Sequence, residues 1–86
     1  MNELSLEYIQ FKPVKRDKSL IGFVSFKIGR EFSFYQLAVH TLLKPKNNIK
    51  IRLVYPEKQE PSQVMQEFID EEINAYLLAN YHESLI

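Results

Sequence analysis

The chain lacks cysteine and tryptophan and contains only two glycines among its 86 residues. Without cysteine, neither a disulfide framework nor a thiolate metal site can form. Two glycines are too few for the loops that hold phosphate groups, and the G-x-S-x-G turn of serine hydrolases is absent. We therefore expect a binding protein that needs no cofactor, and not an enzyme.

Long apolar runs are also missing. The first residues lack the basic start and apolar stretch of a secretion signal, and no apolar run is long enough to cross a bilayer. We expect a cytoplasmic protein without a membrane partner. The 45% hydrophobic and 26% charged residues are typical of a folded chain. This length predicts a single domain, residues 1–86, small enough that pairing into a homodimer would add useful stability.

Charges of the two signs are separated along the chain, although the formal net charge is zero. Residues 1–58 hold all eleven Lys and Arg against five acids, whereas residues 59–86 hold six acids and neither Lys nor Arg. The first part can attract phosphate groups. The second part can repel them, or can neutralise the first part within the fold or across a dimer.

Alternating apolar and polar residues begin near the start of the chain and predict a first strand. The alternation changes phase between Leu6 and Ile9, which indicates a bulge or twist between these residues. Pro13 is expected to stop this strand. Residues 14–19 are then predicted to form a polar connection.

A second and a third strand are predicted on either side of a glycine. Every second residue from Val24 to Ile28 is apolar, which predicts a strand with one buried side. Gly29 follows at the position where a two-residue hairpin turn needs a positive φ. Residues 32–39 predict the third strand, but residues 36–43 would also fit a short helix with one apolar side.

The remaining pattern predicts one more strand and a helix. Residues 44–48 are typical of a turn, and residues 49–55 alternate between an apolar and a basic side. Residues 61–85 carry apolar residues at steps of three and four, the pattern of a long amphipathic helix. The expected fold class is α+β, with a four-stranded antiparallel meander in residues 1–56 followed by one long C-terminal amphipathic helix.

Residues 22–26 match the last five positions of the RNA-recognition signature K/R-G-F/Y-G/A-F-V-x-F/Y. In the fold that carries this signature, a strand and a crossover helix precede the match. The residues before Ile21 have room only for one strand and a loop, and the signature's opening triplet is absent. We interpret the segment as a buried strand, and keep Phe23 and Tyr35 as candidate stacking groups.

Titratable residues that could serve catalysis or metal binding do not form a motif. His40 and His82 are the only histidines and lack the spacing of a metal site. In the predicted helix, Glu67 and Glu71 share a side, which is typical of a solvated acidic surface. We expect no catalytic residue and no metal site.

Basic residues carry the remaining functional signal, because they cluster around the first connection and around the third turn with the fourth strand. In a four-stranded meander both connections can lie at the same end of the sheet, so the two clusters could form one patch. A patch of this kind would contact the phosphate backbone of a nucleic acid. Such lysines also occur simply to decorate loops and protect edge strands. The candidate nucleic-acid-binding residues are Lys12, Lys15, Arg16, Lys18, Lys44, Lys46, Lys50 and Arg52.

Residues spread along the whole chain resemble those of one bacterial family. They are Phe11 and Val14, Leu20, Val24, Ser25 and Ile28, Phe32, Leu37 and Val39, Asn47 and Asn48, Ile51, Leu53, Val54, Pro56 and Lys58, and finally Ile73, Ala75, Tyr76 and Leu77. In this order they resemble the stage V sporulation protein G family of septation regulators. The resemblance implies a small dimeric bacterial protein, built by strand pairing between subunits, that binds DNA or RNA and regulates gene expression or division.

This chain departs from the family pattern at three places. Tyr35 and Gln36 stand where the family usually carries a His-Asp pair, and residues 57–61 replace a longer loop with a His-Pro-Ile step. The family's helix region is linked to DNA contact, whereas residues 70–72 here are three consecutive acids that repel phosphate. The resemblance therefore implies the fold more strongly than the binding site.

A second function is compatible with the same composition. The acidic helix or an exposed strand edge could dock a protein partner, without nucleic-acid binding. That function predicts an exposed apolar patch around Tyr76, Tyr81 and Leu85. Nucleic-acid binding instead predicts a contiguous positive patch.

Overall fold

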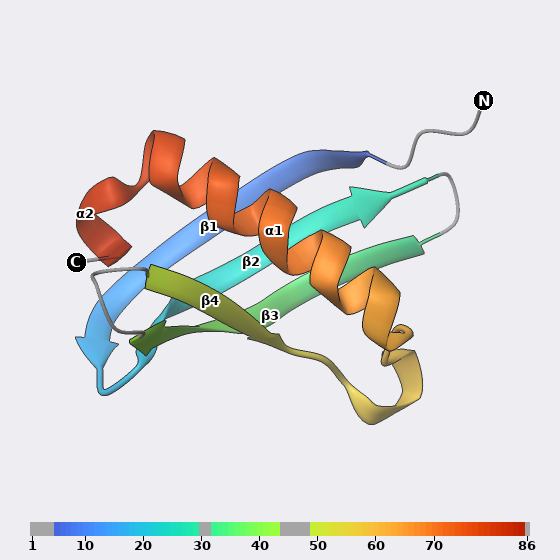
Figure 1. Ribbon diagram of the computed structural model, residues 1–86, viewed down its shortest axis with the longest axis horizontal. Coiled ribbons are helices and arrows are strands. Elements are labelled where there is room, and N and C mark those ends of the chain that lie inside the picture. Colours follow the sequence, from blue (N-terminus) through green and yellow to red (C-terminus); the bar gives the residue numbers. More distant parts are fainter. Residues whose placement is uncertain (1–4, 30–31, 44–48, 86) are drawn as a thin grey trace.

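The computed structural model describes residues 5–29, 32–43 and 49–85 (Figure 1). Four strands form one antiparallel sheet in chain order, namely β1 (Leu6–Asp17), β2 (Leu20–Ile28), β3 (Phe32–Leu43) and β4 (Ile49–Val54). The helical elements that follow are the 3₁₀ turn η2 (Glu57–Gln59), α1 (Gln63–Asn80) and α2 (His82–Leu85). The predicted α+β fold, a four-stranded meander followed by a C-terminal helix, is confirmed.

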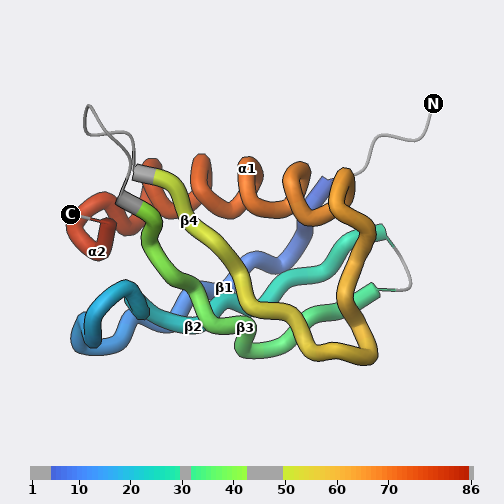
Figure 2. The backbone as a smooth tube through the Cα atoms, turned by 60° about the horizontal axis from the view of Figure 1, so that its bottom comes forward, coloured from blue at the N-terminus to red at the C-terminus, as the bar shows by residue number. Residues whose placement is uncertain are grey.

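The fold has two layers, because α1 lies along one side of the sheet (Figure 2). We call this the covered side, and the opposite side, over which no other described element lies, the uncovered side. Ile69, Ile73 and Leu77 of α1 are fully buried in one core with Val24 and Val39 of the sheet. Each such side chain contributes roughly 1.5–3 kcal/mol of hydrophobic free energy. The covered side thus holds the fold together.

The helical region is shorter and more broken than the sequence pattern predicts. Ser62 caps α1, because its Oγ accepts a hydrogen bond from the backbone N–H of Met65 at 3.3 Å. At the other end Tyr81 leaves helical geometry with φ −137° and separates α1 from α2. Its ring packs edge-on against Phe11 at 5.0 Å, and Leu85 of α2 turns into the core. The predicted C-terminal helix is therefore present as α1, and Tyr81 separates its last part as α2.

Strand β1 runs past Pro13 to Asp17, so the prediction that this proline stops the strand is wrong. Pro13 lies opposite Gly22 in the pairing with β2. Because β1 is the edge strand, its outer side needs no partner for the missing proline N–H. The predicted connection over residues 14–19 shrinks to a tight turn in which Lys18 adopts a positive φ of 59°.

Two of the register shifts in the sheet coincide with a residue that has a positive φ. The bulge predicted in the first strand is confirmed, since the pairing of β1 with β2 shifts between Glu7 and Gln10, and Tyr8 has a positive φ of 55°. In β3, Gln36 has a φ of 52° where the pairing with β2 shifts. Its backbone N–H donates to Ser25 Oγ at 2.9 Å, which holds the bulge in place.

Residues 36–43 are a strand and not the short helix that the pattern also allowed. They pair with β2 on one edge and with β4 on the other, so backbone groups on both edges find partners. Gly29 has the expected positive φ of 64°, and β4 ends at Val54, one residue earlier than predicted. The predicted turn over residues 44–48 lies outside the described residues. In the part of the chain that is described, no helix is long and apolar enough to cross a membrane.

Gly22 lies beneath the ring of Phe11. A Cβ atom at this position would come within 2.6 Å of the ring and 2.5 Å of the Lys12 carbonyl oxygen. The close contact lets Phe11 lie over the β1–β2 pair, where its ring meets Tyr81. The absence of a side chain at Gly22 thus helps to join the sheet to the end of α1.

Candidate nucleic-acid interface

A row of four residues crosses the uncovered side of the sheet, one from each strand. Lys12 is the direct partner of Phe23, Phe23 of Ala38, and Ala38 of Val54. Direct partners in antiparallel strands point to the same side of a sheet. The neighbouring residue Val24 is fully buried on the covered side, so the row points away from α1. It combines an exposed cation with an aromatic ring and two aliphatic side chains.

Basic residues of β4 continue this surface toward one end of the sheet. Arg52 is the partner of His40, and Lys50 is the partner of Leu42, two and four residues before Val54. Arg52 and Lys50 are exposed. His40 is held in place, because its Nδ1 lies 2.8 Å from Ser19 Oγ. Lys50, Arg52 and the imidazole of His40 therefore extend the surface beside the row.

Toward the opposite end, β2 and β3 add another cation and another ring. Ser25 and Lys27 follow Phe23 at steps of two, so both point to the uncovered side. Tyr35 follows the buried Phe34 and is 77% exposed. We define the sheet-face site as these residues of the uncovered side: Lys12, Phe23, Ser25, Lys27, Tyr35, Ala38, His40, Lys50, Arg52 and Val54.

Two carboxylates of β1 flank the sheet-face site. Glu7 is the partner of Lys27 at one end, and Asp17 is the partner of Leu20 at the other. The acids of α1 belong to the other layer, since α1 lies on the covered side (Figure 2). The four Lys and Arg side chains of the site therefore outnumber the carboxylates beside them.

Asp70 is an acid of α1 whose pKa is affected by a cation of the site. Burial raises the pKa of this carboxyl to about 6 from 3.8, with a small increase from the charge of Glu67. The positive charge of Arg52 and a hydrogen bond from the backbone N–H of Leu53 act in the opposite direction and lower the pKa. Asp70 in turn adds to the burial that raises the pKa of Tyr55. Arg52, a cation of the uncovered side, thus also interacts electrostatically with one acid of α1.

The other cations predicted from the first connection lie at the β1–β2 end of the sheet. Arg16 has a structural role there, because its guanidinium donates to Thr41 Oγ1 at 3.0 Å and to the Lys18 carbonyl at 3.2 Å. Lys15 is exposed near the end of β1. Lys18 is exposed in the turn that follows, so Lys15, Arg16 and Lys18 are separate from the central row, whereas the predicted Lys12, Lys50 and Arg52 lie on the uncovered side. Lys44 and Lys46 lie outside the described residues.

Sequence reasoning missed Lys27 and His40. The alternation within β2 already placed Lys27 on the same side as Phe23, and that signal was sufficient to include it. His40 looked like an ordinary polar residue at a strand end. Only its pairing with Arg52 across β3 and β4 brings it into the site.

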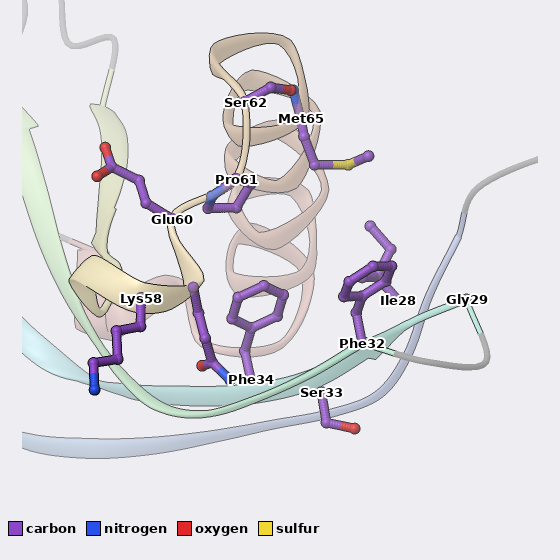
Figure 3. Close-up of a pocket in the computed structure, with 11 residues that line it drawn as sticks. Ile28, Gly29, Phe32, Ser33, Phe34, Lys58, Glu60, Pro61, Ser62 and Met65 are labelled. Atoms are coloured by element: carbon purple, nitrogen blue, oxygen red, sulfur yellow. The ribbon is translucent and has the colours of Figure 1, made fainter.

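A separate pocket of about 830 Å³ opens between the β2–β3 end of the sheet and the start of α1 (Figure 3). Its apolar lining includes Ile28, Phe32, Phe34, Pro61 and Met65. The polar side chains of Ser33, Lys58 and Glu60 point away from it (Figure 3). This pocket offers apolar contact but few polar groups to orient a ligand, so we place the candidate site on the sheet.

The apolar patch that a protein-docking helix predicted does not form. Leu85 is buried, and Tyr76 and Tyr81 are partly buried against the core. Tyr76 also donates from its hydroxyl to the Ile9 carbonyl at 3.4 Å. These residues join the helices to β1 and are not a free surface.

No protein-family model, no curated protein and no solved structure matches this chain. The resemblance to the stage V sporulation protein G family accordingly remains an expectation from the residues alone.

Proposed function

We propose that this chain is a nucleic-acid-binding regulatory protein of the cytoplasm that contacts phosphate groups through the sheet-face site. The observation that supports it most directly is the row from Lys12 through Phe23 and Ala38 to Val54, with Arg52 beside it. A solvated strand face without a binding role would more often carry scattered charges of both signs. Here the charge is mainly positive and surrounds an apolar centre, a combination that suits phosphates with sugars or bases between them.

The position of the acidic helix supports the same proposal. Nucleic-acid binding required that the six acids after residue 58 should not neutralise the basic surface. The helix α1, which carries four of these acids, lies along the covered side of the sheet, whereas the sheet-face site is on the uncovered side (Figure 2). Arg52 lowers the pKa of Asp70, so this carboxyl of α1 is within electrostatic range of one cation of the site.

Direct binding measurements test the proposal. Fluorescence anisotropy of labelled RNA and DNA is measured with the purified chain between about 50 mM and about 200 mM salt. We expect affinity to fall steeply with salt. Lys12→Ala and Arg52→Ala should each reduce the slope of log affinity against log salt by about one, as expected when one phosphate contact is lost.

Lys58→Ala is the matched control, because it removes the same charge from the η2 turn outside the site. It should leave both affinity and slope close to those of the unmodified chain. Absence of binding even at about 50 mM salt would contradict the proposal. Equal losses in all three variants would show a nonspecific charge effect without a defined site.

The regulatory role and the dimer rest on the family resemblance, and both stay predictions. A dimer would place two sheet-face sites on one particle and increase avidity for a long nucleic acid. Light scattering of the protein as it elutes from a size-exclusion column measures its molar mass and shows whether it is a monomer or a dimer. We propose a binding function without catalysis.

A further inference from the structure

We infer that the sheet-face site takes single-stranded nucleic acid, with bases stacked on Phe23 and Tyr35 and the phosphates beside its cations. This inference rests on the proposed function and adds the form of nucleic acid that the site accepts. Single strands offer unpaired bases with free ring faces, whereas duplexes keep their bases stacked inside.

Two aromatic rings of the site have no aromatic partner within the described part of the chain. Most rings in this protein pack on one another near the covered side, as Phe26 does on Phe34 at 5.2 Å. Among the described residues, neither Phe23 nor Tyr35 has a ring neighbour of this kind. Phe23 lies at the centre of the uncovered side, and Tyr35 is one of the most exposed side chains. Neither ring would therefore have to leave an aromatic partner to receive a base.

The spacing of the two rings also suits a single strand. Ser25 is two residues beyond Phe23 on β2, and the Gln36 N–H bonds to it across the strands at 2.9 Å. Tyr35 is the residue next to Gln36, so the two rings occupy neighbouring rows on adjacent strands. Rows that face the same side of a sheet are two residues, or about 7 Å, apart. Extended strands with separated bases can span such a step, because flat rings accept any base.

Positive charge surrounds the two rings. Lys27 lies two residues beyond Ser25 on β2, where it is the partner of Ser33 on β3, and Lys12 of β1 is the direct partner of Phe23. Arg52 is adjacent to the same row through β4. Cations thus stand on three sides of the ring pair, where a bound strand would carry its phosphates.

Across the residues that the structure describes, the uncovered side of the sheet lacks the features that bind duplex DNA. Proteins that read duplex DNA commonly place a helix or a two-stranded ribbon in the major groove. In the described part of this chain, the one helix of sufficient length is α1, which packs on the covered side and carries acids. No described element projects from the uncovered side toward a groove (Figure 2). The sheet face therefore fits an exposed strand better than a closed helix.

The test compares labelled single-stranded RNA, single-stranded DNA and duplex DNA of one sequence, using anisotropy with the whole chain. We expect the single strands to bind at least about tenfold more tightly than the duplex. Phe23→Leu and Tyr35→Leu should each weaken single-strand binding about tenfold, because each removes a stacking surface. Their salt slopes should stay unchanged, since no cation is lost.

Phe32→Leu is the matched control. Phe32 is also an exposed ring, but it lines the pocket beside α1 (Figure 3). This variant should bind like the unmodified chain. Phe23 is partly buried, so thermal unfolding checks that its variant folds, and the more exposed Tyr35 provides an independent variant.

The outcomes separate the two proposals. Equal or tighter binding of the duplex, still weakened by Lys12→Ala, would overturn the single-strand inference and leave the proposed function in place. Single-strand binding unaffected by both ring variants would also overturn the inference. Absence of binding to every probe would overturn both proposals. A preference for RNA or for DNA among the single strands supports the inference and identifies the natural form.

Discussion

Asp70 provides the sharpest prediction about stability. Its pKa is raised to about 6 from 3.8, so the folded chain holds this proton more tightly than the unfolded chain does. At 1.36 kcal/mol per pKa unit, a shift of roughly two units corresponds to about 3 kcal/mol. Partial solvent exposure reduces this value, and about 1–2 kcal/mol is a reasonable expectation. This stability is fully present below about pH 3.8 and is lost as the pH rises through about 6.

Asp70→Asn removes the charge and nearly keeps the shape of the side chain. Because the ionised carboxylate is costly to bury, we expect the variant to be more stable than the unmodified chain at about pH 7.5 by about 1–2 kcal/mol. The difference should vanish near pH 4, where Asp70 is mostly protonated in the folded chain. Urea unfolding followed by far-UV circular dichroism measures both free energies of unfolding across this pH range.

Glu71→Gln is the control for Asp70→Asn, since it removes an exposed carboxylate next to Asp70 on the same helix. It should show the pH profile of the unmodified chain. The reasoning is refuted if Asp70→Asn is less stable at about pH 7.5, because Arg52 and the Leu53 N–H would then outweigh burial. Parallel pH profiles for the variant and the unmodified chain would refute it equally.

Three further changes test the packing and the helix start. Gly22→Ala should lower the free energy of unfolding by about 2 kcal/mol or more, because its Cβ would meet the ring of Phe11 at 2.6 Å. Ser62→Ala should lower it by about 1 kcal/mol through loss of the helix cap. Ile73→Ala should lower it by about 2–5 kcal/mol, whereas Leu78→Ala, at an exposed site on the same helix, should change it much less. Urea unfolding at one pH measures all four variants.

The sequence pattern predicted the architecture because each strand has one apolar and one polar side. Where a prediction from this pattern was wrong or left open, contacts between separate elements decided the structure. Pro13 would end a central strand, but β1 lies at the edge of the sheet, and no local pattern states that position. The pattern favoured a third strand but left a short helix open for residues 36–43, and pairing with β2 and β4 on both sides decides for the strand. The end of α1 at Tyr81 likewise depends on the packing of its ring against Phe11.

The candidate site was only partly predictable for the same reason. Charge clusters along the chain pointed to Lys12, Lys50 and Arg52, which lie on the uncovered side. They also pointed to Arg16, which instead bonds to Thr41 as part of the structure. The pattern could not show which side of the sheet would stay open, because that depends on where α1 packs. Once α1 covers one side, the cross-strand register gathers the remaining residues.

The element that covers the sheet is the last long element in chain order, and this affects how the protein is made. The ribosome synthesises all four strands before α1, so the apolar side of the newly formed sheet at first has no helix packed on it. Neighbouring strands can pair early because their contacts are local in sequence. Val24 and Val39 nevertheless stay open to solvent, or to a chaperone, until Ile73 and Leu77 arrive. A chain whose synthesis stopped before α1 would be basic and would expose the apolar side of its sheet. Cellular quality control should remove such a fragment.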